Sequence, residues 1–275
     1  MEIRPRRATE LVDASFQLLR KYFPLLVTVS ALTMAPGVIY RIIERDAMSN
    51  PQLMVAHPGA FIGVGLTVLL CVVVCDAVLT VAVSQAYLEG AIDLGLAFSA
   101  GLQGMLAVLA ATFLRLLLFM VVVIVAGVAV ALVALLKTPA LIVLVFPFVM
   151  WATVYLLLRT FALIPIVLLE HAGPTVAMGR SLRLTRDCTA HVFFSLALAS
   201  VLYLIVTMIV SVLGLTLLTP TTAGIIGAVA SIPIYPLMSV VSTLLYYDLR
   251  IRKEGFDLEI MSRELGGAPA PLPAA

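Results

Sequence analysis

Three charged side chains interrupt long apolar stretches of the sequence, and a charge in such a place is costly enough to indicate a function. Asp76, Arg115 and Arg159 each stand about ten residues, or ~15 Å along a helix, from the end of their stretch that we expect to be cytoplasmic. Tyr203 stands near the same depth in a later stretch. We therefore predict that these four residues form one polar layer inside a membrane.

Two interpretations of this layer stay open. In the first, Asp76 neutralises one arginine while the other binds backbone carbonyls or hydroxyls, so that the layer holds the helices together. In the second, two arginines against one aspartate leave a net positive pocket. Such a pocket suits an anionic lipid headgroup or a small anion.

A second basic group follows Pro174, since proline is typical of the first turn of a helix. Arg180, Arg183 and Arg186 recur every three residues. Apolar residues between them supply another surface: Val176, Met178, Leu182 and Leu184. This pattern predicts an amphipathic elbow helix lying on the membrane. Its arginines act either as a cytoplasmic anchor or as a site for lipid phosphate or a protein partner.

A third group marks the point where the last apolar stretch ends. Its residues are Tyr246, Tyr247, Asp248, Arg250, Arg252 and Lys253. The tyrosines suit the membrane interface, and the charges after them suit its surface. Phe256 and Leu258 flank Asp257, so we expect this exit motif to fold back onto the helices.

Catalytic and metal-binding patterns are absent from the sequence. His57, His171 and His191 are scattered, and the one neighbouring acid–base pair, Glu170 with His171, is explained by capping of a helix end. Cys71 and Cys75 lie one helical turn apart, where packing is a simpler explanation than a metal. We expect no catalytic residue, no metal and no cofactor.

Composition identifies the class of protein. Hydrophobic residues make up 63% of the chain and charged residues 12%, against about 25% charged in soluble domains. With a mean hydropathy of +1.16, the chain is predicted to be an all-α integral membrane protein. We expect six transmembrane helices at about 23–40, 60–87, 106–136, 140–169, 191–218 and 223–247, with kinks near Pro147 and Pro165.

Basic residues predict the orientation. Of the 17 Lys and Arg residues, twelve fall on one side of the predicted spans and three on the other, which places both termini in the cytoplasm. The net charge of +2 gives no indication of nucleic-acid binding, and we expect none. The predicted organisation is a basic arm and interfacial helix (1–22), a membrane domain (23–248), a cytoplasmic exit segment (249–265) and a disordered tail (266–275).

An internal repeat is a further hypothesis. Amphipathic segments lead directly into a span at 10–23, 93–106 and 175–193. Aligning Ala14, Ala97 and Ala177 also aligns Leu19, Leu102 and Leu182. Three elbow-plus-hairpin repeats would account for both observations.

The exit motif (246–258) and the segment 169–185, with Glu170, Gly173–Pro174 and Arg180–Ser181, carry a family resemblance. Together with the six spans, they resemble a bacterial family named after the glycerophosphoryl diester phosphodiesterase membrane domain. The resemblance covers about residues 8–260 and implies a protein of the bacterial inner membrane. In that family a soluble domain can carry the phosphodiesterase activity, and we expect no such catalytic domain in this sequence.

These observations favour a non-catalytic inner-membrane protein that contacts or organises anionic lipid or a partner in an envelope process. The alternative is a transporter or permease for a small anionic or lipid-like solute, because prolines in the spans permit the broken helices of transporters. A continuous cavity that reaches Arg115 and Arg159 would favour transport. A filled bundle core would favour scaffolding.

Overall fold

A computed structural model describes residues 5–43, 58–135, 142–217 and 220–256 of the chain. Within these ranges the chain is helical and contains no strand. The helices are α1 (Ala8–Lys21), α2 (Phe23–Ile43), α5 (Pro58–Leu88), α6 (Leu94–Gln103), α7 (Met105–Leu135), α8 (Ile142–Thr160), α9 (Leu163–Leu169), α10 (Pro174–Leu184), α11 (Thr189–Leu217), α12 (Pro220–Ser231) and α13 (Tyr235–Glu254).

Six stretches of helix in the described ranges are long and apolar enough to cross a membrane, as the composition predicts. They are Phe23–Tyr40, Ile62–Leu88, Met105–Val133, Val145–Leu169, Thr189–Gly214 and Thr222–Glu254. The prediction of an all-helical chain is therefore confirmed for the described residues, as is the prediction of six helical stretches able to span a membrane.

Two of these stretches are broken. The fourth is interrupted between α8 and α9, and Pro165 lies in the first turn of α9. Pro147, by contrast, lies within α8, which continues through it. The sixth stretch, predicted as the span 223–247, is interrupted at 232–234 between α12 and α13. Pro233 lies in this break and Pro236 in the first turn of α13, where a missing N–H is tolerated.

Short helices occupy each of the three predicted elbow positions. α1 precedes α2, α6 lies between α5 and α7, and α10 lies between α9 and α11. The Asp93 side chain caps α6 by accepting a hydrogen bond from the Leu96 N–H at 3.1 Å. Gly173 precedes α10, and Pro174 begins it, as expected.

The last helix extends beyond the expected end of the membrane domain. We placed a separate exit segment from residue 249, whereas α13 continues to Glu254 and ends at Gly255, which has a positive φ of 65°. Ion pairs one helical turn apart, Asp248–Arg252 at 2.7 Å and Arg250–Glu254 at 3.0 Å, favour this extension. The predicted disordered tail (266–275) lies outside the described residues.

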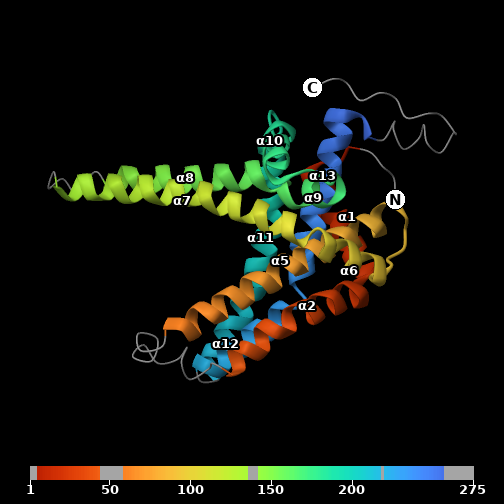
Figure 1. The fold of residues 1–275 in the computed structure, drawn as a ribbon, viewed down its shortest axis with the longest axis horizontal. Coiled ribbons are helices and arrows are strands. Elements are labelled where there is room, and N and C mark those ends of the chain that lie inside the picture. Colours follow the sequence, from red (N-terminus) through yellow and green to blue (C-terminus); the bar gives the residue numbers. More distant parts are fainter. Residues whose placement is uncertain (1–4, 44–57, 136–141, 218–219, 257–275) are drawn as a thin grey trace.

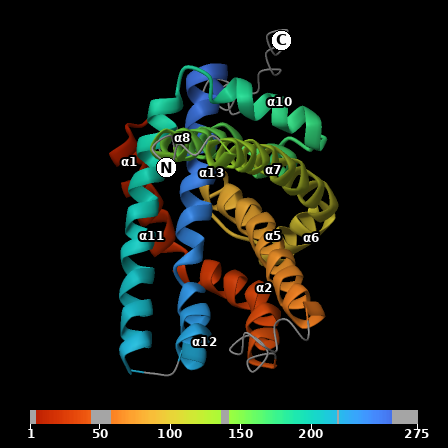
Figure 2. The ribbon, with the colours of Figure 1, turned by 90° about the vertical axis from the view of Figure 1, so that its left-hand side faces the viewer.

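The helices converge at one end and diverge at the other. Figure 1 shows α1, α6 and α10 gathered where the long helices meet, while the α7–α8 hairpin projects away from α2, α5 and α12. Turned by 90°, Figure 2 shows α11 and α13 running side by side. α13 is buried along most of its length, so it forms the centre of the molecule.

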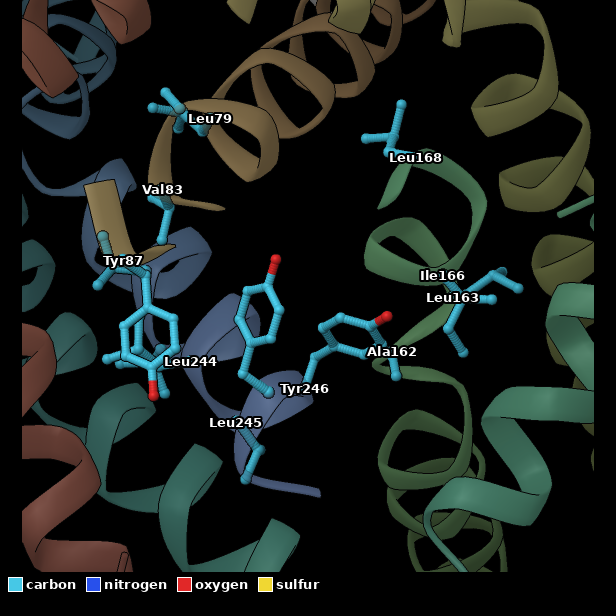
Figure 3. Close-up of a cluster of buried hydrophobic side chains, with 14 of the residues drawn as sticks. Leu79, Val83, Tyr87, Ala162, Leu163, Ile166, Leu168, Leu244, Leu245 and Tyr246 are labelled. Carbon is cyan, nitrogen blue, oxygen red and sulfur yellow. The ribbon is translucent and has the colours of Figure 1, made fainter. Parts of the chain in front are cut away.

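The core lies at this convergent end. Buried side chains of α5, α9 and α13 meet there, among them Leu79 and Val83 of α5, Ile166 of α9 and Tyr246 of α13 (Figure 3). The outer parts of α7, α8 and α11 instead expose large apolar side chains along their length. Such surfaces suit contact with lipid hydrocarbon.

Candidate intramembrane binding site

A cavity of about 420 Å³ opens among α5, α7, α8, α9, α11 and α13. Both interrupted spans border it, since Phe161 lies at the break after α8 and Tyr235 begins α13. Most of its wall is apolar. Its polar and charged lining residues are Asp76, Thr80, Arg115, Ser200, Tyr235, Ser239 and Ser242.

Asp76 receives a hydrogen bond in this cavity. The Tyr235 hydroxyl donates to Asp76 Oδ1 at 2.8 Å. Tyr235 is the first residue of α13, so the break before α13 sets the position of this hydroxyl. A neutral donor thus satisfies part of the hydrogen-bonding capacity of a carboxylate that is otherwise costly within a membrane.

Arg115 lines the same cavity from α7. Among the residues that the structure describes, its guanidinium has no hydrogen bond and no ion pair within 4.0 Å. Asp76 is an opposite charge that lines the same cavity, but the hydrogen bond that it accepts comes from Tyr235. The five donors of the Arg115 guanidinium are therefore available to an anion.

Arg159 and Tyr203 do not line this cavity. On α8 the lining residues are Val154, Leu157 and Leu158, and one further residue turns the helix by about 100°, which directs Arg159 away from them. Depth along a span, on which the predicted layer was based, does not specify this rotation. The cavity therefore brings together Asp76 and Arg115 from the predicted set of four.

Arg159 has surroundings of its own. Its guanidinium lies over the Tyr155 ring, 5.8 Å from the ring centre, and its carbonyl accepts a hydrogen bond from the Ser181 hydroxyl at 2.8 Å. Its Nε is buried and has no hydrogen-bond partner among the described residues. Arg159 is thus a second arginine within a span that has no ion pair in the described ranges.

Tyr235 is the site residue that we did not predict. The available signal was its position between Pro233 and Pro236, which interrupt an otherwise apolar span and favour a new helix start. A polar aromatic at such a start can direct its hydroxyl into the bundle.

The elbow arginines divide into two kinds. Arg180 pairs with Glu254 at 3.0 Å and, through Nε, with Glu170, so it joins α10 to α13 and to the end of α9. Arg183 and Arg186 are exposed. The exposed pair is therefore the part of the elbow that is accessible to lipid phosphate or a partner.

The exit motif forms contacts inside the protein. Asp248 is 3% exposed and accepts from the Arg6 N–H at 2.7 Å and from Arg252 Nε at 2.7 Å. Oδ2, the oxygen that accepts from Arg252, also lies 2.9 Å from His191 Nε2. One carboxylate thus connects the arm before α1 and the start of α11 to α13.

The two tyrosines of the motif are also buried. The Tyr246 hydroxyl donates to Glu170 at 2.7 Å, and the Tyr247 hydroxyl lies 2.6 Å from the Ser84 hydroxyl. Phe256 stacks on Tyr247 with ring centres 5.6 Å apart. The return of the chain onto the helices, as expected for the exit motif, is therefore seen at Phe256. Leu258 lies outside the described residues, and Lys253 is exposed, 3.4 Å from Asp187.

Comparison of the chain with protein-family models, curated proteins and solved structures finds no match in any of the three. What the protein binds must therefore be inferred from the chemistry of its own residues.

Proposed function

We propose that this chain is a non-catalytic protein of the bacterial inner membrane that binds the anionic headgroup of a membrane lipid in the cavity at Arg115. In this proposal both termini are cytoplasmic and the cavity serves the cytoplasmic leaflet. The position of Arg6 beside Asp248 supports a common side for the N-terminal arm and the end of α13.

The single observation that carries the proposal is an arginine without an ion pair in a mostly apolar cavity. The Tyr235 hydroxyl occupies one oxygen of Asp76, while the Arg115 guanidinium has no such partner in the described ranges. A charge in this position needs a counter-ion or water, and an anionic headgroup supplies the counter-ion.

The size and wall of the cavity agree with this ligand. About 420 Å³ is within the range of 300–1,000 Å³ that is typical of small-molecule sites. Thr80, Ser200 and Ser239 add hydroxyl groups that can bind headgroup oxygens. The N-terminus of α13 adds a positive partial charge beside Tyr235.

The test is lipid retention by an Arg115→Gln variant. The purified full chain is incubated with dioleoyl phosphatidylglycerol, and bound lipid is counted by native mass spectrometry. We expect retention to fall about tenfold, because the variant loses a charge-assisted hydrogen bond to the headgroup. Dioleoyl phosphatidylcholine, which has no net charge, serves as the comparison lipid.

Arg186→Gln is the matched control, since it removes the same charge from an exposed position just after α10. Its retention of phosphatidylglycerol should stay near that of the unmodified chain. Equal losses in the two variants would show that binding follows surface charge, and the proposal would then be rejected.

Transport of the same kind of solute is the second candidate function. It is favoured by the two interrupted spans that border the cavity, because broken helices line the sites of many transporters. Reconstituted vesicles separate the two functions: fluorescent phosphatidylglycerol would change leaflet with time if the chain transports it. Retention without such movement would leave binding as the function.

A further inference from the structure

Asp76 and Arg115 bring opposite charges to one cavity. Asp76 lies on α5 and Arg115 on α7, and both side chains line the cavity wall. No ion pair joins the two within 4.0 Å, but the positive charge of Arg115 acts on the Asp76 carboxylate. One positive and one negative charge therefore balance each other inside a mostly apolar wall, where an excess of either sign is costly.

A bound anionic headgroup disturbs this balance. The proposed ligand adds a second negative charge beside Arg115, and an apolar wall solvates the excess poorly. Uptake of one proton by Asp76 removes the excess, because the site then holds one arginine and one anion. The ligand and the proton should therefore each favour the binding of the other, since such a coupling is reciprocal.

The contacts of Asp76 leave one carboxylate oxygen for the proton. The Tyr235 hydroxyl donates to Oδ1 at 2.8 Å, and in the described part of the chain Oδ2 accepts no hydrogen bond. A proton that passes from water to Oδ2 leaves the Tyr235 contact in place, because Oδ1 still accepts. It also turns Asp76 into a donor, so that the carboxylic acid can donate to an oxygen of the headgroup.

Asp76 is the group of this site that can take up a proton. Among the described lining residues, the other two with titratable side chains are Arg115 and Tyr235. At neutral pH an arginine is always protonated and a tyrosine ordinarily is. Tyr203 of α11 and Tyr247 of α13 are tyrosines as well, and both lie outside the lining.

The other helices around α5 bring no competing group to Asp76 in the described ranges. The sequences of α6 and α9 contain no titratable residue. On α2, Tyr40 lies against Gly63, which is ~20 Å from Asp76 along α5, and Arg41 follows Tyr40. On α5 itself, the Cys75 thiol lies 3.9 Å from a hydroxyl of α2.

We propose that Asp76 takes up a proton when the anionic headgroup binds at Arg115, so that the lipid binds more tightly as the pH falls. This inference rests on the proposed function and adds a regulation of the same site. A lipid without net charge would leave the balance undisturbed, and its binding would not depend on Asp76.

The test measures lipid affinity as a function of pH. The purified full chain in neutral detergent is titrated with radiolabelled dioleoyl phosphatidylglycerol between about pH 5 and pH 8, where the phosphodiester stays ionised and histidines titrate. We expect the dissociation constant to fall with falling pH, by at most about tenfold per pH unit if one proton accompanies each lipid. A constant affinity over this range would overturn the proposal.

Asp76→Asn separates this effect from other titrations. Asparagine keeps an acceptor for Tyr235 but cannot ionise, so the affinity should be the same at every pH and about tenfold tighter than that of the unmodified chain at the alkaline end. Asp187→Asn removes a carboxylate that is 78% exposed, and His191→Gln removes a histidine beside Asp248. Both should keep the pH dependence. Its persistence in Asp76→Asn, or its loss in His191→Gln, would contradict the proposal.

Proton uptake can also be measured directly on the unmodified chain, which avoids any effect of a substitution on folding. In weakly buffered detergent solution, an indicator dye should report about one proton taken up per lipid bound at neutral pH, and fewer at acid pH. Binding without proton uptake would overturn the coupling.

Arg115→Gln distinguishes this inference from the proposed function. Loss of affinity in Arg115→Gln, with a pH-independent affinity in the unmodified chain, would reject the coupling and leave the headgroup site standing. Arg115→Gln that binds like the unmodified chain would reject both.

Discussion

At the scale of the residue, the charged side chains of this protein divide by how completely they are satisfied. Asp248 accepts from Arg6 and Arg252 and lies against His191. Arg115 and Arg159, in contrast, have no ion pair in the described ranges. A charge satisfied several times contributes to stability, whereas one without a partner in an apolar setting is a candidate for binding.

The buried carboxylate gives the prediction that belongs to this scale. Asp248→Asn keeps the shape of the side chain but removes the charge that Arg252 faces at 2.7 Å. We expect the free energy of unfolding to fall by about 2 kcal/mol, since a charge-assisted hydrogen bond is lost in a mostly buried site. Thermal unfolding in detergent micelles measures the change.

Asp187→Asn is its control. Asp187 is 78% exposed and lies 3.4 Å from Lys253, so its removal should alter the unfolding free energy by less than about 0.5 kcal/mol. If both variants unfolded like the unmodified chain, Asp248 would not be the junction that its contacts indicate.

At the scale of the element, close packing of α6 on α5 depends on one glycine. A Cβ at Gly101 would lie 2.8 Å from Val78 Cγ2 and 3.0 Å from Val78 Cα, so the helices approach as far as a hydrogen side chain allows. Such small residues let helix backbones come together within membranes. α6 is thereby held against the span that carries Asp76.

Two alanine substitutions test this contact, because they should change the free energy of unfolding in opposite directions. Gly101→Ala should destabilise the fold by about 1–3 kcal/mol, because α6 must move away from the backbone of α5. Gly179→Ala in α10 meets nothing within 4 Å and should stabilise by up to about 1 kcal/mol through helix propensity. Thermal unfolding of the two variants gives the comparison, and shifts in the same direction would contradict the contact.

The sequence predicts where the helices begin and end better than it predicts which side of each helix faces the cavity. Apolar runs of about 20 residues define the spans, and Pro165 predicts the break after α8. The contact of Tyr235 with Asp76 was not predicted, because it depends on the rotation of α13 after the break that precedes it. Arg159 was assigned to the layer by depth, but the rotation of α8 directs it away from the cavity. The repeat of three elbow-plus-hairpin units remains a prediction.

At the scale of the whole molecule, the side of the membrane determines which lipids can reach the arginines. The elbow helices α1, α6 and α10 gather where the spans converge (Figure 1). The exposed Arg183 lies on α10, and the exposed Arg186 follows its end. The excess of basic residues predicts that this end faces the cytoplasm. The headgroup would then come from the inner leaflet. Arg115 lies about ten residues from the end of α7 that faces this leaflet.

Labelling of single cysteines tests this orientation. Cys71, Cys75 and Cys188 are first replaced by serine, and Arg186→Cys or Thr222→Cys then provides one exposed thiol at either end of the bundle. A membrane-impermeant maleimide should label position 222 in right-side-out vesicles and position 186 in inverted ones. The opposite pattern would place the elbows outside the cytoplasm. The ligand would then have to come from the outer leaflet of that membrane, and lipids of that leaflet would become the probes for Arg115.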